Sequence, residues 1–126
     1  MKNKTQPPLN GTPSYWKARL RPGTTGDKPT RTSWAYVQSI SHTDVRFHCE
    51  KLLKKGLLVT LDIQAIHKGI KHPLHITGKV LSCILLSCGT LYGIDLQITT
   101  ISKADQEFVE QYIEDKKSMK LSYSSA

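Results

Sequence analysis

The chain has 126 residues and a formal net charge of +8 at pH 7. A chain of this length suits one domain that buries about two-thirds of its unfolded surface, so neither disulfides nor a metal are needed for folding. Its three cysteines are an odd number, which argues against a secreted disulfide scaffold and indicates a cytoplasmic protein. Residues 1–13 lack the apolar core of a signal peptide, and the longest apolar-rich run, residues 80–88, is too short to span a bilayer.

The positive charge is concentrated near the N-terminus. Residues 1–31 contain seven of the lysines and arginines, one acid and five of the six prolines. This composition predicts a basic, flexible arm over residues 1–31, suited either to an anionic partner or to solvation alone. Within the arm, Tyr15, Trp16 and Leu20 are expected to dock on the domain, with the basic side chains between and after them facing outward.

Five segments alternate between apolar and polar residues, which is typical of half-buried antiparallel strands. They cover residues 32–41, 45–49, 57–65, 74–86 and 91–98. In the first segment the alternation leaves open whether Trp34 and Tyr36 face the core or the surface. Gly78, inside the fourth, predicts a bulge or sharp bend.

The period changes to that of a helix over residues 103–117, with Ser102 as the expected N-cap. We therefore expect a mainly β fold, a small antiparallel barrel of about six strands closed by one C-terminal α-helix. The expected organisation is an arm over residues 1–31, a barrel with its helix over residues 32–117, and a disordered tail over residues 118–126.

This order of elements and several local patterns resemble the PilZ domain family. The patterns that carry the resemblance are VQSIS at residues 37–41, VRF at 45–47, KGLLVTL at 55–61, GKV at 78–80 and LYGIDL at 91–96. The resemblance extends over roughly residues 17–117 and implies a six-stranded barrel with a closing helix. It also implies a non-enzymatic bacterial signalling protein that recognises cyclic di-GMP.

The resemblance further implies which residues contact the ligand. The family's RxxxR motif matches Lys17 to Arg21, with Lys17 in the place of the first arginine and Arg19 as an added cation. The family's (D/N)xSxxG motif matches Ser39 to Asp44, where only Ser41 is identical to the motif. Arginine forks suit phosphate oxygens and the O6 and N7 atoms of guanine. The expected ligand-binding residues of this degenerate site are Lys17, Arg19, Arg21, Ser39 and Ser41.

The same sequence offers weaker signals for other functions. His67, His72 and His75 match no zinc-binding spacing, and the Ser, His and Asp residues around position 42 lack a nucleophile elbow, so neither a metal site, a cofactor nor catalysis is predicted. A PilZ-like adaptor that binds partner proteins of motility or envelope systems without a ligand stays an alternative. A barrel that binds nucleic acid through its basic residues and aromatic rings is the least favoured of the three.

Overall fold

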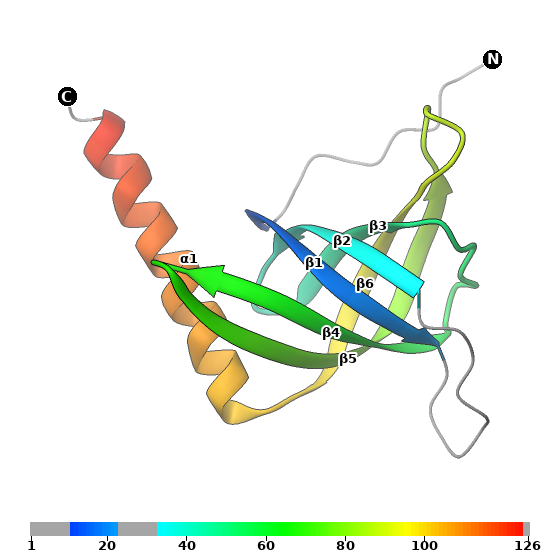
Figure 1. Cartoon of the computed structure of the whole chain (residues 1–126), viewed down its shortest axis with the longest axis horizontal. Coiled ribbons are helices and arrows are strands. Elements are labelled where there is room, and N and C mark those ends of the chain that lie inside the picture. Colours follow the sequence, from blue (N-terminus) through cyan, green and yellow to red (C-terminus); the bar gives the residue numbers. More distant parts are fainter. Residues whose placement is uncertain (1–10, 23–32, 125–126) are drawn as a thin grey trace.

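A computed structural model describes residues 11–22 and 33–124, and the side chains within them up to residue 118. Within these residues, six strands are followed by one helix (Figure 1). They are β1 (Thr12–Pro22), β2 (Ser33–Ile40), β3 (Asp44–Cys49), β4 (Leu58–His67), β5 (Ile70–Leu85), β6 (Tyr92–Ile101) and α1 (Lys103–Ser124).

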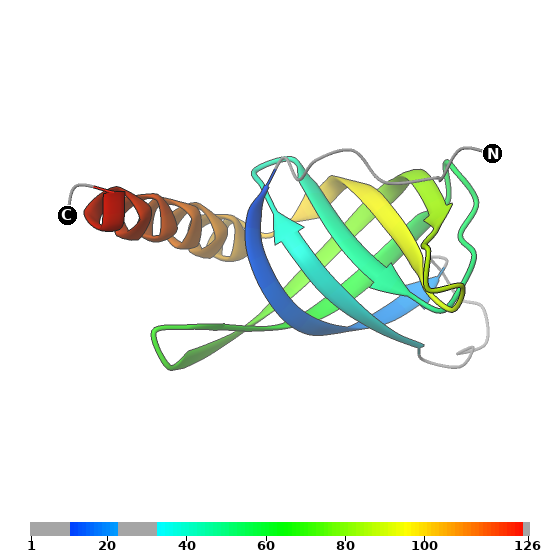
Figure 2. The same cartoon turned by 90° about the horizontal axis from the view of Figure 1, so that it is seen from above.

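The strands form a closed barrel in the order β1-β2-β3-β6-β5-β4, and each neighbouring pair is antiparallel. Figure 2 shows the strands wrapped around the barrel and α1 leaving it at one end. Closure pairs both sides of each described strand and so removes the exposed sheet edges that favour aggregation. The predicted fold class, a small antiparallel barrel with a C-terminal helix, is confirmed.

The prediction of a flexible arm is wrong for residues 12–22, which form β1. This strand pairs with β2 on one side and with β4 on the other. Trp16, Ala18 and Leu20 are buried, and the side chains between them are exposed, which is the alternation of a half-buried strand. Trp16 and Leu20 therefore dock as expected, whereas the expectation for Tyr15 is wrong, because this residue is 71% exposed. Averaging the composition over 31 residues concealed this short pattern. The remainder of the predicted arm, residues 1–10 and 23–31, lies outside the described residues.

The interior of the barrel takes the small side chains of β2. Ala35 and Val37 are fully buried, whereas Trp34 and Tyr36 are 39% and 43% exposed. Of the two orientations that the sequence left open, Trp34 and Tyr36 therefore face the surface and not the core. The largest fully buried side chains are Phe47, Leu20, Ile40, Leu61, Ile63, Leu74, Ile76, Ile94 and Leu96.

The bulge predicted at Gly78 is confirmed. The register between β5 and β6 shifts between Thr77 and Gly78. A Cβ atom at Gly78 would lie 2.5 Å from the backbone oxygen of Gln97 and 2.7 Å from the side chain of Leu96. Glycine is required here because the neighbouring backbone approaches too closely for any side chain.

Helix α1 begins at Lys103, as predicted, but ends at Ser124 and not at residue 117. Ser102 accepts a hydrogen bond from the backbone N–H of Asp105 at 3.1 Å, as an N-cap should. The disordered tail predicted from residue 118 is wrong as far as Ser124, because the helix continues to that residue. This stretch contains neither proline nor glycine, so no residue in it breaks the helix. Residues 125 and 126 lie outside the described part.

The buried side of α1 packs against one end of the barrel, where the ring centroids of Tyr112 and Trp16 are 4.6 Å apart. Two histidines of the β4–β5 hairpin contact carboxylates of α1. His67 is 2.7 Å from the carboxylate of Asp115, and His72 is 3.1 Å from that of Asp105.

Among the residues described, no cluster of three or more His, Cys, Asp or Glu side chains is arranged to hold a metal ion. The same part of the chain contains no helix with the length and apolar character that crossing a membrane requires.

Candidate functional site

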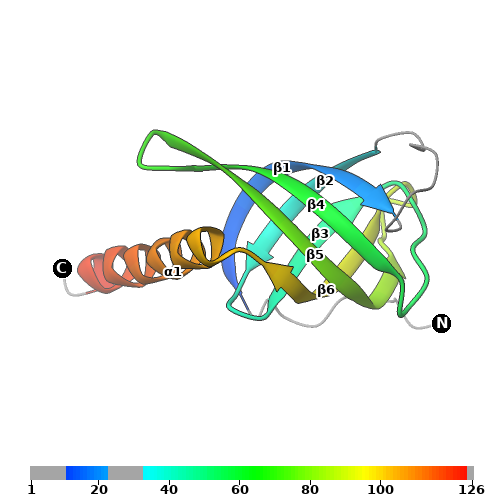
Figure 3. The same cartoon turned by 90° about the horizontal axis from the view of Figure 1, so that it is seen from below.

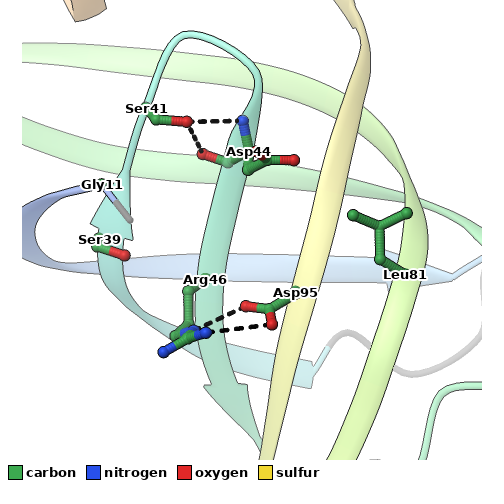
Figure 4. A pocket seen from close by; sticks show the side chains of 7 residues that line it. All are labelled: Gly11, Ser39, Ser41, Asp44, Arg46, Leu81 and Asp95. Atoms are coloured by element: carbon green, nitrogen blue, oxygen red, sulfur yellow. Dashed lines mark hydrogen bonds and ion pairs between the residues drawn. The ribbon is translucent and has the colours of Figure 1, made fainter. Parts of the chain in front are cut away.

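A small hollow of about 120 Å³ lies on the outer face of the barrel, where β2, β3, β5 and β6 run side by side (Figure 4). It contains both serines of the predicted ligand motif. Its lining residues are Gly11, Ser39, Ser41, Asp44, Arg46, Leu81 and Asp95.

A bulge in β2 explains why Ser39 reaches the outer face. The register between β2 and β3 shifts between Val37 and Ser39, so that one extra residue is inserted. Ile40 then occupies the core, and Ser39 lies opposite Arg46 of β3. Because Val45 and Phe47 fill the barrel interior, the side chain of Arg46 points outward beside Ser39.

The hydroxyl group of Ser41 holds the turn between β2 and β3. Its oxygen accepts hydrogen bonds from the backbone N–H groups of Thr43 at 3.3 Å and Asp44 at 3.0 Å. Its own proton is donated to the carbonyl oxygen of Asp44 at 3.3 Å. A serine hydroxyl has one donor and two acceptor positions, and all three are used here. A ligand therefore contacts this hydroxyl only at the expense of the turn.

An ion pair between Arg46 and Asp95 forms the floor of the hollow. The guanidinium Nε and Nη2 atoms lie 2.7 and 3.2 Å from the two carboxylate oxygens, and Ser82 donates a further hydrogen bond to Asp95 at 3.2 Å. Burial, together with the charge of Arg46, lowers the pKa of nearby His48. Sequence reasoning missed both ion-paired residues. The signal was present, since each is a charged residue between two apolar ones on strands that pair with each other.

The basic residues of β1 lie on the same outer surface. Lys17 Nζ is 4.0 Å and Arg19 Cζ is 5.6 Å from the ring centroid of Trp34, so that two cations flank one indole ring. Arg21 is directed elsewhere, because its Nε lies 3.0 Å from the carboxylate of Asp62 on β4.

The predicted site residues thus divide into two groups. Lys17 lies opposite Tyr36 in the ladder, three residues before Ser39 on β2. At a rise of about 3.3 Å per residue, the backbone of Lys17 is about 10 Å from that of Ser39, and Trp34, whose ring both cations flank, is five residues or about 16 Å away. Lys17, Arg19, Ser39 and Ser41 therefore lie on the outer side of β1, β2 and the turn after β2, in two separate places, whereas Arg21 lies at the far end of β1.

Known structures share this fold. The chain is similar to the inhibitor of motility MotI/DgrA of Bacillus subtilis, with a TM-score of 0.71 and 14% identity over 86% of this chain and 49% of that one. It is also similar to MrkH of K. pneumonia, with a TM-score of 0.56 and 15% identity over 89% of this chain and 49% of that one. The chain spans about half the length of each. No protein-family model matches the sequence, and none of the curated proteins matches it. At these identities the likeness shows the fold alone.

Proposed function

We propose that this chain is a non-enzymatic PilZ-like signalling module that binds cyclic di-GMP on the outer face of its barrel. The observation that carries the proposal is the placement of two features on the outer side of the neighbouring strands β1, β2 and β3. A pair of cations flanks an exposed indole ring, and a polar hollow follows on the same surface. The sequence resemblance to PilZ domains and the fold shared with an inhibitor of motility support it.

The dimensions and charges suggest how the ligand lies. A hollow of about 120 Å³ is smaller than the roughly 300–1,000 Å³ of pockets that enclose a ligand, so the dinucleotide lies across the surface. Ser39 and the turn at Ser41 contact the edge of one guanine. Lys17 and Arg19 neutralise the phosphates, and the ring of Trp34 supplies a face on which a base stacks.

Calorimetric titration with cyclic di-GMP tests the proposal. We expect saturable binding that a Lys17→Ala/Arg19→Ala double variant abolishes and that a Lys54→Ala/Lys55→Ala variant retains. The control removes two neighbouring, exposed lysines that lie outside the surface described. Arg21→Ala separately tests the third predicted cation, which must leave Asp62 in order to reach the ligand. Absence of any binding heat at millimolar cyclic di-GMP would contradict the proposal.

One observation favours an adaptor that works without a ligand. The β4–β5 hairpin projects beyond the barrel beside α1 (Figure 3), and it exposes Ile66 by 48% and Ile70 by 68%. Exposed apolar residues on a projecting element suit contact with a partner protein. If cyclic di-GMP does not bind, an Ile66→Ser/Ile70→Ser variant that loses a partner while keeping its thermal stability would support this function.

Nucleic acid is the third candidate, because Trp34 and Tyr36 are exposed beside Lys17. Titration with random single-stranded oligonucleotides at two salt concentrations distinguishes it from the first. Phosphate-driven binding weakens steeply with salt, in proportion to the number of phosphates contacted. Affinity for cyclic di-GMP that exceeds that for oligonucleotides at high salt would favour the dinucleotide.

A further inference from the structure

A second, larger hollow of about 520 Å³ lies between the start of β1 and the middle of α1. Figure 2 shows α1 leaving the barrel at the end where β1 curves past the start of the helix. We call this hollow the helix groove. Its lining residues are Gly11, Thr12, Pro13, Ser14, Tyr15, Tyr112, Lys116 and Lys117. Its volume falls within the roughly 300–1,000 Å³ range of sites that bind small molecules.

The charge of the helix groove favours an anion. Lys116 and Lys117 contribute two ammonium groups, and none of the lining residues carries a carboxylate. Lys116 Nζ also lies 5.5 Å from the ring centroid of Tyr112, which holds its chain along the groove wall. An anionic group in the groove would face two cations without opposing charge from the lining.

The strand that forms the other wall is irregular at this point. The register between β1 and β2 shifts between Pro13 and Trp16, and β1 pairs with β4 only from Ala18 onward. Ser14 and Tyr15 therefore have no ladder partner on either neighbouring strand. Tyr15 has a φ of 52°, a conformation that residues other than glycine rarely adopt, and its side chain is 71% exposed. The phenolic group of Tyr112 donates a hydrogen bond to the Pro13 carbonyl at 2.7 Å and holds this bulge against the helix.

Ser14 supplies an independent observation. Its hydroxyl oxygen is buried and has no hydrogen-bond partner in the described structure. Buried hydroxyl groups are nearly always paired, because an unpaired one loses its bonds to water without replacement. Strained backbone and an unpaired buried hydroxyl in one wall of a groove are features that concentrate at binding sites.

We propose that the helix groove binds a phosphate monoester joined to an aromatic ring, as in a nucleoside monophosphate. Lys116 and Lys117 hold the phosphate, whose oxygens also accept a hydrogen bond from Ser14. The exposed ring of Tyr15 stacks on the base at the rim. The site goes beyond the cyclic di-GMP surface and shares only Gly11 with its hollow.

Titration with AMP, followed by amide chemical shifts and by calorimetry, tests this site. We expect saturable shifts at Ser14, Tyr15, Lys116 and Lys117. A Lys116→Ala/Lys117→Ala variant should bind AMP at least about tenfold more weakly, since charge-assisted hydrogen bonds to phosphate are lost. The Lys54→Ala/Lys55→Ala variant, which also removes two adjacent exposed lysines, should bind as the parent chain does.

Two ligand controls separate the phosphate from the base. Adenosine, without the phosphate, should produce no saturable shifts, whereas inorganic phosphate alone should shift Lys116 and Lys117 but not Tyr15. Equal binding of adenosine and AMP would overturn the assignment of the lysines. The Lys17→Ala/Arg19→Ala variant should bind AMP normally, so that failure here is distinguishable from failure of the cyclic di-GMP proposal.

Ser14→Ala distinguishes a ligand contact from a structural role. Removing an unpaired buried hydroxyl should raise the melting temperature of the free chain while weakening AMP binding. A variant that is less stable and binds AMP unchanged would show that the hydroxyl supports the fold. Absence of shifts along the groove at millimolar AMP would overturn the proposal as a whole.

Discussion

Arg46 on β3 donates two hydrogen bonds, of 2.7 and 3.2 Å, to the carboxylate of Asp95 on β6, and Arg46 is only 9% exposed. Removal of the carboxylate from such a pair takes two charge-assisted hydrogen bonds away from a nearly buried cation. Asp95→Ala should therefore lower the free energy of unfolding by about 3 kcal/mol, measured by urea denaturation. Ser82→Ala, which removes only one hydrogen bond to Asp95, should cost about 1 kcal/mol. Equal effects of the two substitutions would contradict a structural role for the ion pair.

Asp44 places a carboxylate at the hollow in which the proposed ligand would lie. Two unit charges about 4 Å apart in water repel by about 1 kcal/mol, so Asp44→Asn should tighten cyclic di-GMP binding about fivefold. The substitution keeps the shape of the side chain and its contact with the Thr43 hydroxyl, which is 2.8 Å from the carboxylate. Calorimetry measures the change, with the exposed Glu50→Gln as the matched control. Weaker binding would show that the carboxylate accepts a hydrogen bond from the ligand.

The contact between α1 and the β4–β5 hairpin should depend on pH. The hydrogen bond with His67, followed by that from Gln111, lowers the pKa of Asp115 from 3.8 to about 2. Because the folded-state pKa is below the unfolded value, the stabilisation is complete above the unfolded pKa and is lost as the pH falls through the folded pKa. In thermal unfolding followed between pH 3.8 and about 2, Asp115→Asn should lose less stability on acidification than the parent chain.

Glu114→Gln is the control for that comparison, since it removes an exposed carboxylate from the neighbouring position of the same helix. Its melting curve should follow the pH dependence of the parent chain. Parallel curves for the parent and Asp115→Asn would mean that the carboxylate of Asp115 does not contribute to acid sensitivity.

Two cysteines should differ in reactivity. Hydrogen bonds from the backbone and hydroxyl of Thr90 lower the pKa of the exposed Cys88 thiol, whereas burial raises the pKa of Cys49. The thiolate is the nucleophile, so iodoacetamide at neutral pH should modify Cys88 first and Cys49 last. Peptide mass spectrometry over time measures both rates. Thr90→Val, which removes the hydroxyl 3.6 Å from the sulfur, should slow the reaction of Cys88, and modification of Cys49 in the native chain before Cys88 would refute the order.

Local periodicity explains most of what was predicted correctly. The alternation in residues 57–65 predicted a half-buried strand, and Val59, Leu61 and Ile63, which share one face of it, are all buried. The change of period at residue 103 marked the start of α1, and the N-cap followed from the hydroxyl of Ser102. These features depend on neighbours within a few residues, so the chain itself carries their signal.

The first strand shows where composition misleads. A basic, proline-rich segment is normally unable to bury apolar area, yet Trp16, Ala18 and Leu20 alternate within it and fill the barrel. Because β1 closes the barrel between β2 and β4, its stability comes from pairing with residues up to 45 positions away, as between Ala18 and Ile63. No short window of sequence contains that information.

The sequence by itself determined the strand periodicity and the capped helix, because each arises from contacts between residues that are close in the chain, and the order of these elements predicted the barrel class. Only the tertiary structure decided that the bulge after Val37 turns Ser39 outward, that Arg46 meets Asp95, and that Arg21 is held by Asp62. Those outcomes depend on strand register and closure, which join residues tens of positions apart, and a shift of one residue reverses the face that each side chain occupies.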